Sequence, residues 1–275
     1  MRDKLQTLLA RLRFDGMAAA LDKELERAER EATPGPELIH RLLCAEAASQ
    51  RERSLAYRLK QARLPWDWTL STFPFDEQPS INRGQIKTLA GLDFLSRANN
   101  IVLTGGTGTG KTGIAIGILR EACLNGHRGR FYDAQDLLDE LYASLADRST
   151  SRLLKRLSRL QPLVIDKVDN LNVKPEQANA FFRLIDQRYN RVSTIITTSL
   201  QLDEWYELFG KKNLVDALLD RLRHRCISIN IDGPSLRTPE AQAASPGHKP
   251  PARPVRQQSR RGAADHPRSS VGRRR

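Results

Sequence analysis

Hydrophobic positions in the first sixty residues recur at helical spacing. Leucines between Leu5 and Leu12 fall on one face of a helix, and a second run from Met17 to Leu25 does the same. The segment Thr33–Pro36 interrupts the pattern, and a third apolar series runs from Leu38 to Leu59. The pattern predicts an all-helical N-terminal domain over residues 1–63.

A proline-rich and aromatic segment follows over residues 64–82. It contains three prolines and four aromatic side chains, namely Trp66, Trp68, Phe73 and Phe75. This composition indicates a connector whose rings dock on the next domain. Ser80 or Asn82 can cap a helix that would run to about Arg97.

From residue 100 onward, short apolar runs alternate with longer helical patterns. Strands are expected near 101–104, 130–132, 163–165, 193–197 and 226–231. Helices are expected near 111–125, 134–146, 152–160, 175–189 and 214–223. Strands that are separated by helices pair in parallel with right-handed crossovers. Residues 83–236 are therefore predicted to form an α/β core with a parallel, doubly wound sheet.

Charge is concentrated at the C-terminus. Residues 237–275 hold ten basic and two acidic residues, whereas residues 1–236 hold 35 and 30. The terminal segment is rich in Pro, Ser, Ala and Arg, so we expect a disordered basic tail. The net charge of +13 predicts an acidic partner such as nucleic acid, although the predicted folded body contributes only +5 of it.

Cysteine usage and hydropathy argue against a disulfide-rich, zinc-binding or membrane-spanning protein. Cys44, Cys123 and Cys226 are odd in number and widely spaced, which favours free thiols over a zinc site or a disulfide framework. No apolar run approaches the ~20 residues that cross a bilayer. The N-terminus also lacks a signal-peptide core. We expect a cytoplasmic protein that makes no membrane contact.

Residues 105–112 match the phosphate-binding pattern GxxxxGK[ST]. The match directly follows a predicted strand and begins a predicted helix, which is the context that the pattern requires. Its glycines let backbone N–H groups approach phosphate oxygens, and the helix N-terminus favours the same negative charge. Lys111 would reach the outer phosphates of ATP, and Thr112 would offer a hydroxyl to Mg²⁺. The predicted ATP-binding residues are Gly105, Gly106, Thr107, Gly108, Thr109, Gly110, Lys111 and Thr112.

A carboxylate is expected beside this loop, at the end of the 163–165 strand. Asp166 would hold Mg²⁺ there, directly or through water. In most ATPases of this layout the next residue is acidic and polarises the attacking water, but here it is Lys167. A protonated lysine cannot act as a general base, so we expect ATP binding with slow or absent hydrolysis. The sequence leaves open whether Asp169 reaches the site.

The second half of the third predicted helix is basic. Between Ser49 and Arg63 it holds five cations and one acid, Glu52. Two interpretations stand: a solvated helix face, or contacts to the phosphates of a DNA duplex. The candidate DNA-binding residues are Arg51, Arg53, Arg58, Lys60 and Arg63.

Six stretches of the chain carry a family resemblance. They are residues 12–17 (LRFDGM), 73–81 (FPFDEQPSI), 100–112 (NIVLTGGTGTGKT), 177–182 (QANAFF), 191–198 (RVSTIITT) and 216–222 (DALLDRL). Together they resemble the IstB-type transposition helper ATPases, which are AAA+ proteins related to the helicase loader DnaC. The resemblance extends from about Leu5 to Leu236, and the tail has no counterpart in it.

The resemblance implies a helical DNA-engaging region followed by an AAA+ core. It implies an ATP-dependent oligomer that forms on double-stranded DNA, deforms it and presents it to a cognate transposase. Lys111, Thr112 and Asp166 match the family's nucleotide and magnesium ligands. Arg221 matches the arginine that reaches the γ-phosphate in a neighbouring subunit, and its alternative is a solvated helix residue.

Two departures from the family pattern bear on catalysis. The family's Asp-Glu-x-Gly-Tyr is replaced by Asp166-Lys-Val-Asp-Asn170, and Ser199 occupies the position of its sensor asparagine. These changes are typical of an insertion-sequence gene copy that has accumulated substitutions. Its protein would still bind ATP and assemble but would have lost ATP hydrolysis.

Two other functions fit the same sequence. A helicase loader of the DnaC type would use this fold to remodel a protein, with its N-terminal region gripping a helicase. An inert DNA-coating protein would bind ATP as a structural ligand, which Lys167 keeps open. Transposition is the leading hypothesis, and a transposase gene directly upstream would favour it over the loader.

Overall fold

The computed structural model describes residues 1–169, 171, 173–201, 204–210 and 212–237. Backbone contacts group Met1–Leu236 into one compact unit. The predicted disordered tail lies, except for Arg237, outside the described residues. The domain boundaries drawn at residues 63 and 82 stay predictions.

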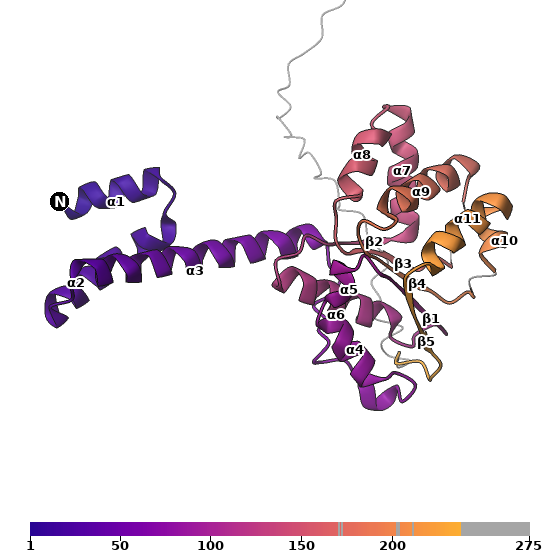
Figure 1. Cartoon of the computed structure of the whole chain (residues 1–275), viewed down its shortest axis with the longest axis horizontal. Coiled ribbons are helices and arrows are strands. Elements are labelled where there is room, and N and C mark those ends of the chain that lie inside the picture. The colour runs from indigo at the N-terminus through magenta and orange to yellow at the C-terminus, as the bar shows by residue number, and fades with distance from the viewer. Residues whose placement is uncertain (170, 172, 202–203, 211, 238–275) are drawn as a thin grey trace, which may run out of the picture. The chain divides into compact units, whose positions relative to one another are not determined.

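The N-terminal region is helical, as the apolar spacing predicts (Figure 1). Its helices are α1 Arg2–Arg11, α2 Asp15–Glu31 and α3 Gly35–Ala62. Leu9, Leu21 and Leu42 are buried where the three helices meet. The carboxylate of Glu46 accepts hydrogen bonds from the backbone N–H of Gly16, at 2.8 Å, and of Met17, at 3.2 Å. It therefore ties α3 to the electropositive N-terminus of α2.

A five-stranded parallel sheet forms the core and confirms the predicted α/β class. Its order is β2–β3–β4–β1–β5, and every neighbouring pair is parallel. The strands are β1 Asn100–Gly105, β2 Arg130–Asp133, β3 Leu163–Asp166, β4 Thr194–Thr198 and β5 Cys226–Ile231. The helical elements are the 3-10 turn η1 Phe75–Glu77, α4 Arg83–Ala90, α5 Asp93–Ser96, α6 Lys111–Leu124, α7 Ala134–Ala146, α8 Thr150–Leu157, α9 Pro175–Arg188, α10 Trp205–Phe209 and α11 Lys212–Arg223.

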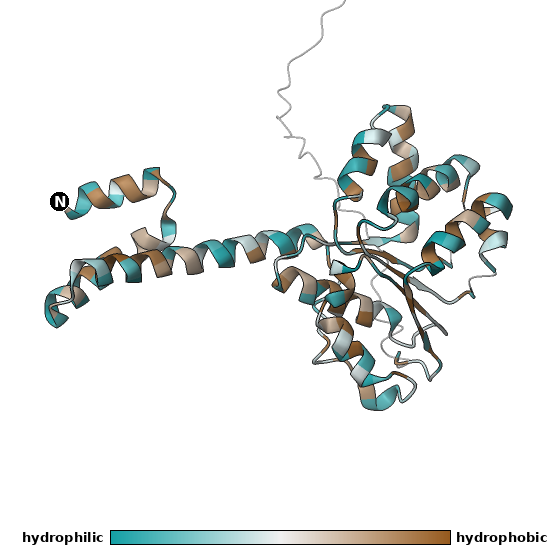
Figure 2. Cartoon of the chain, in the orientation of Figure 1, coloured by the Kyte–Doolittle hydropathy of each residue, from teal (hydrophilic) through white to brown (hydrophobic). Residues whose placement is uncertain are grey.

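Hydrophobic layers cover both faces of the sheet. Ile101 and Leu103 of β1 pack with residues of α4, α5 and α6, whereas Val102 packs on the other face with residues of α7, α9 and α11. Figure 2 shows hydrophobic residues running along the strands and on the sides of the helices that face them. Burial on both faces explains why the central strands β1, β3 and β4 show no alternation of apolar and polar residues, whereas the edge strand β5 alternates.

The connector lies along α6. The ring of Trp68 lies against Gly113, where a Cβ would come within 2.6 Å of it. Phe73 and Phe75 pack against the hydrophobic layer that contains α6. Trp66 stacks on Trp68, with ring centroids 5.4 Å apart. The aromatic residues therefore fix the path from α3 to the phosphate loop.

Two details of secondary structure differ from the sequence-based expectation. The single helix expected from Asn82 to about Arg97 is two helices, because Leu92 adopts a left-handed conformation with φ 66°. Asn82 is the cap of the first, and its Oδ1 accepts from the backbone N–H of Gln85 at 3.1 Å. The short helix α10 was not predicted, and its Trp205 is fully buried.

The cysteines are free thiols in three different environments. Cys44 is exposed, Cys123 is buried and Cys226 is intermediate. Burial raises the pKa of Cys226 to about 11, which keeps this thiol protonated at neutral pH. Across the described residues, no helix has the length and apolar character of a membrane span.

Candidate nucleotide-binding site

The phosphate loop joins β1 to α6 at the carboxyl edge of the sheet. Gly105 has φ 139°, and a Cβ there would come within 2.2 Å of the carbonyl oxygen of Ile231 on β5. Gly110 has φ 98°, and a Cβ there would come within 2.7 Å of the ring of Phe73. Both positions therefore require glycine for the backbone conformation and for space.

Lys111 begins α6 and folds back over the loop. Its Nζ donates to the carbonyl oxygens of Gly105 and Gly106, at 2.7 Å each. The hydroxyl of Thr109 donates to the carbonyl oxygen of Gly106 at 2.9 Å. These contacts hold the loop against the N-terminus of α6, and the positive end of a helix dipole favours an anion. A phosphate oxygen would be a stronger partner for Lys111 than these neutral carbonyls.

Asp166 meets two hydroxyl groups beside the loop. Its Oδ1 accepts hydrogen bonds from Thr112 Oγ1, at 2.8 Å, and from Thr197 Oγ1 on β4, at 2.5 Å. Burial raises the pKa of Asp166, while the two hydroxyl groups and the nearby Lys167 oppose that rise. Thr197 was missed from the sequence, because nothing about a threonine within an apolar strand marks it as a site residue.

The oxygens of Thr112 and Asp166 suit magnesium. Hydroxyl and carboxylate oxygens are the hard ligands that Mg²⁺ prefers, and Mg²⁺ is usually held by few protein groups together with substrate phosphates. The Thr112 hydroxyl at the end of the phosphate loop donates a hydrogen bond to the Asp166 carboxylate at the end of β3. A cation there would also offset the cost of ionising the buried Asp166 carboxylate.

Lys167 is turned toward the neighbouring strand. Its Nζ lies 3.3 Å from Oδ2 of Asp133, the last residue of β2. Its backbone is left-handed, with φ 61°, and its N–H donates to Thr197 Oγ1 at 2.9 Å. Position 167 thus presents an ion-paired ammonium group where most ATPases of this layout have a carboxylate.

The sequence left open whether Asp169 contacts the nucleotide site, and in the structure its side chain contacts Ser199, the residue directly after β4. Its Oδ2 accepts from the backbone N–H of Ser199 at 2.7 Å and from the Ser199 hydroxyl. Asp169 and Ser199, which both stand at positions that depart from the family pattern, are therefore in contact with each other. Neither of these hydrogen bonds involves Thr112 or Asp166.

Arg221 is held within its own chain. Its Nε lies 2.9 Å from Oδ1 of Asp186 on α9, and its Nη1 donates to the carbonyl oxygen of Ala217 at 2.9 Å. The side chain is 34% exposed. Its partners in this chain are on α9 and α11, not in the phosphate loop.

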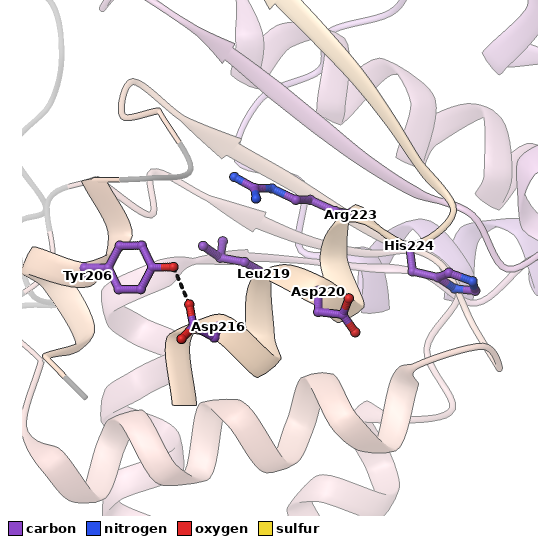
Figure 3. Close-up of a pocket in the computed structure, with 6 residues that line it drawn as sticks. All are labelled: Tyr206, Asp216, Leu219, Asp220, Arg223 and His224. Carbon is purple, nitrogen blue, oxygen red and sulfur yellow. Dashed lines mark hydrogen bonds between the residues drawn. The ribbon is translucent and has the colours of Figure 1, made fainter. Parts of the chain in front are cut away.

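A hollow of about 260 Å³ lies beside the same helix (Figure 3). Tyr206 of α10 and Asp216 of α11 point toward each other there and share a hydrogen bond. The remaining lining residues are Leu219, Asp220, Arg223 and His224. Two of the lining side chains are carboxylates, which disfavour a nearby phosphate, so we assign the nucleotide to the loop instead.

The candidate DNA-binding cations of α3 do not share one face. Successive residues of a helix turn by about 100°, which places Arg51 and Arg58 on one side and Arg53 and Lys60 on the other. A duplex lying along one side of α3 would therefore meet only part of the predicted set. Arg63 follows the end of the helix, and its side chain is exposed.

Two of these cations make internal contacts. The Nε of Arg58 donates to the carbonyl oxygen of Cys123 near the end of α6, at 2.8 Å. Arg53 forms ion pairs with Asp15 and, at 3.0 Å, with Glu46. Arg58 thus anchors α3 to the core, and Arg53 supports the packing of α2 on α3.

The fold and the site together define a class of protein. The parallel sheet, the phosphate loop between β1 and α6, and Asp166 at the end of β3 are those of a P-loop ATP-binding protein. The crystal structure of the DnaC helicase loader superimposes with a TM-score of 0.53 at 24% identity, over 62% of this chain and 99% of that one. At this identity the likeness supports the fold alone.

The chain belongs to the IstB-like ATP-binding protein family, whose model matches residues 7–244. It is 36% identical over 241 residues to a protein of Pseudomonas aeruginosa named for ATP binding in insertion sequence IS21, covering 88% of this chain and 91% of the relative. A similarly named protein of IS5376 from Geobacillus stearothermophilus is 32% identical over 240 residues, covering 87% and 96%. The predicted family is confirmed: the chain is an IstB-like ATP-binding protein, and these relatives are named for insertion sequences.

Replacing Asp166 with asparagine should stabilise the nucleotide-free fold while weakening magnesium binding. Because burial raises the pKa of Asp166, stability should fall as pH rises from the ordinary carboxyl range through that raised pKa. The asparagine variant should lack this fall and should lose roughly 10–100-fold or more in Mg²⁺-dependent ATP affinity. Thermal unfolding across pH and ATP titration would measure both. Asp136→Asn, at an exposed position of α7, is the control, and equal effects in the two variants would contradict the assignment.

Proposed function

We propose that this protein captures duplex target DNA in an ATP-dependent assembly and presents it to its cognate transposase. The observation that carries the proposal is the contact of Thr112 with Asp166 beside a preformed phosphate loop. Family membership supports the transposition context, and the net charge of +13 supports a nucleic-acid partner.

The nucleotide would bind along the loop from Gly105 to Thr112. The backbone N–H groups of the loop would bind the phosphates, with Lys111 turning from its two carbonyl partners to the outer ones. Thr112 and Asp166 would hold Mg²⁺, which neutralises phosphate charge when bound. Thr197 would keep Asp166 oriented through the hydrogen bond of its hydroxyl.

Assembly would join copies of this chain through Arg221. An exposed ion pair such as Arg221–Asp186 contributes only about 0–1 kcal/mol, so breaking it costs little. A γ-phosphate of a neighbouring copy would offer this guanidinium more charge than Asp186 does. The oligomer would then depend on bound triphosphate.

DNA would be engaged by the N-terminal helical region. Arg51, Lys60 and Arg63 are exposed and form no ion pair with any carboxylate in the described part of the chain. They are the candidates for direct phosphate contact. Arg53 and Arg58 would act mainly by holding α3 in place, because both already have internal partners.

The ion pair of Lys167 with Asp133 supports binding with slow hydrolysis. It leaves a cation at the position from which a carboxylate would polarise water. The likeness to the DnaC loader concerns the fold alone, so family membership favours transposition over the loader alternative.

The proposal is tested by assembling the full chain on long duplex DNA with ATP, with ADP and without nucleotide. Electron microscopy should show assemblies on DNA only with ATP. The DNA affinity should fall roughly a thousandfold or more between 50 and 200 mM salt, as about six phosphate contacts require. Assembly that is the same with and without ATP, or a DNA affinity that does not change with salt concentration, would refute the proposal.

A chain lacking residues 238–275 should keep its ATP affinity.

A further inference from the structure

Each of the five strands of the core has an exposed arginine in the loop that precedes it. Because all strands are parallel, their amino ends lie at one edge of the sheet, opposite the phosphate loop. Each strand is preceded, within four residues, by an exposed arginine in the loop that enters it. These residues are Arg97, Arg128, Arg159, Arg191 and Arg225.

Hydrogen bonds join these entrance loops side by side. Arg225 accepts at its carbonyl oxygen from the N–H of Asn100, at 2.9 Å, and its Nη1 lies 3.5 Å from the carbonyl oxygen of Arg97. Arg128 accepts from the N–H of Gln161 at 2.9 Å. The N–H of Leu163 donates to the carbonyl oxygen of Ser193 at 3.3 Å, and the N–H of Thr194 donates to Oδ1 of Asn100 at 3.0 Å. These bonds link the five loops in the order of the strands, and we name the resulting strip the amino-edge surface.

The amino-edge surface is positive and its charge is not neutralised locally. None of the five entrance loops, at residues 97–99, 125–129, 158–162, 189–193 and 224–225, contains an acidic residue. None of the five arginines forms an ion pair with a described carboxylate. Several cations elsewhere in the core do form ion pairs, namely Arg120–Asp67, Arg156–Glu140, Arg221–Asp186 and Lys167–Asp133.

The amino-edge surface continues into the basic half of α3. Arg58 anchors α3 at the end of α6, directly before the loop that carries Arg128. Arg63 lies near Arg130, the first residue of β2: burial lowers the pKa of Arg130, and the charge of Arg63 lowers it further. Cations thus follow one another from α3 across the start of the sheet.

We propose that the amino-edge surface binds the phosphate backbone of duplex DNA, as an extension of the α3 contacts. The five strands, about 4.8 Å apart, span roughly 19 Å, and a duplex presents a negative charge every ~1.7 Å of its axis. Guanidinium groups match phosphate geometry in two-pronged hydrogen bonds. DNA at this edge would leave the ATP site, at the opposite edge, accessible. The inference rests on the proposed DNA-binding function.

Helix C-termini offer another reason for arginine at this edge. The helices α6, α9 and α11 end just before three of the entrance loops, and cations near helix C-termini favour stability. A purely structural role would therefore change the stability of the protein rather than its salt-dependent DNA affinity. The experiment must separate the two.

A full-length triple variant, Arg128→Gln with Arg159→Gln and Arg191→Gln, makes that separation. DNA affinity would be followed by fluorescence anisotropy on a random-sequence duplex with ATP across a salt series. The slope of log affinity against log salt should fall by about 2–3, since each lost contact removes ~0.9. The matched control, Lys87→Gln with Arg183→Gln and Lys212→Gln, removes the same charge outside the entrance loops and should leave the slope unchanged.

The outcomes distinguish the inference from the proposed function. An unchanged slope in the triple variant, with DNA binding intact, would overturn the amino-edge surface and leave the proposed function standing. A lower melting temperature with an unchanged slope would show the structural role. Loss of transposase binding with unchanged DNA affinity would identify an acidic protein as the partner and overturn the inference. A wild-type chain that binds no DNA would overturn the proposed function itself.

Discussion

Replacing Lys111 with alanine should nearly abolish ATP binding, and with it ATP-dependent assembly on DNA. The Nζ of Lys111 lies over the loop, held by the carbonyl oxygens of Gly105 and Gly106. Hydrogen bonds to charged groups contribute about 1.5–3 kcal/mol each, so losing the contacts of this ammonium group should weaken ATP affinity roughly 100-fold or more. Isothermal titration calorimetry measures the change.

Lys87→Ala is the matched control, because it removes an exposed lysine from α4. It should leave ATP affinity unchanged. If Lys111→Ala bound ATP as tightly as the wild type, the nucleotide would have to bind elsewhere, and the hollow between α10 and α11 would become the next candidate (Figure 3).

Replacing Lys167 with glutamate should convert slow hydrolysis into measurable turnover. The substitution puts a carboxylate directly after Asp166, where it can polarise the attacking water. General-base catalysis contributes a factor of about 10²–10⁴ to a rate, so we expect the rate of ATP hydrolysis to rise by a factor in this range. Steady-state phosphate release, with and without duplex DNA, is the measurement.

Lys167→Gln separates the two effects of that substitution. It removes the ammonium group and its ion pair with Asp133 but supplies no base. It should stay close to the wild-type rate. Rates raised equally in the Gln and Glu variants would show that the cation inhibits hydrolysis and that no base is missing. Robust turnover by the wild type, or no increase in the Glu variant, would contradict the account of hydrolysis.

The phosphate loop could be predicted because its information is local. Eight consecutive residues fix the backbone, and the strand before them and the helix after them are visible as apolar patterns. The class of fold was predictable for a similar reason, since regular alternation of strands and helices leaves few topologies. The break between α4 and α5 was not predictable, because a leucine such as Leu92 carries no signal for positive φ.

The partners of the site residues could not be predicted, because they come from distant parts of the chain. Thr197 reaches Asp166 only because β4 lies next to β3. Asp133 meets Lys167 only because β2 pairs with β3 in a register that places Asp133 beside Asp166. Such contacts depend on strand order and register, which the spacing of residues in the sequence does not specify.

The most direct test is an equilibrium titration of the full chain with ATP, in the presence of Mg²⁺ and again with the metal removed by a chelator. We expect saturable binding that weakens without Mg²⁺ and is lost in the Lys111→Ala variant. A wild-type protein with no measurable affinity for a nucleoside triphosphate in the presence of Mg²⁺ would contradict the account, whatever the family to which the chain belongs.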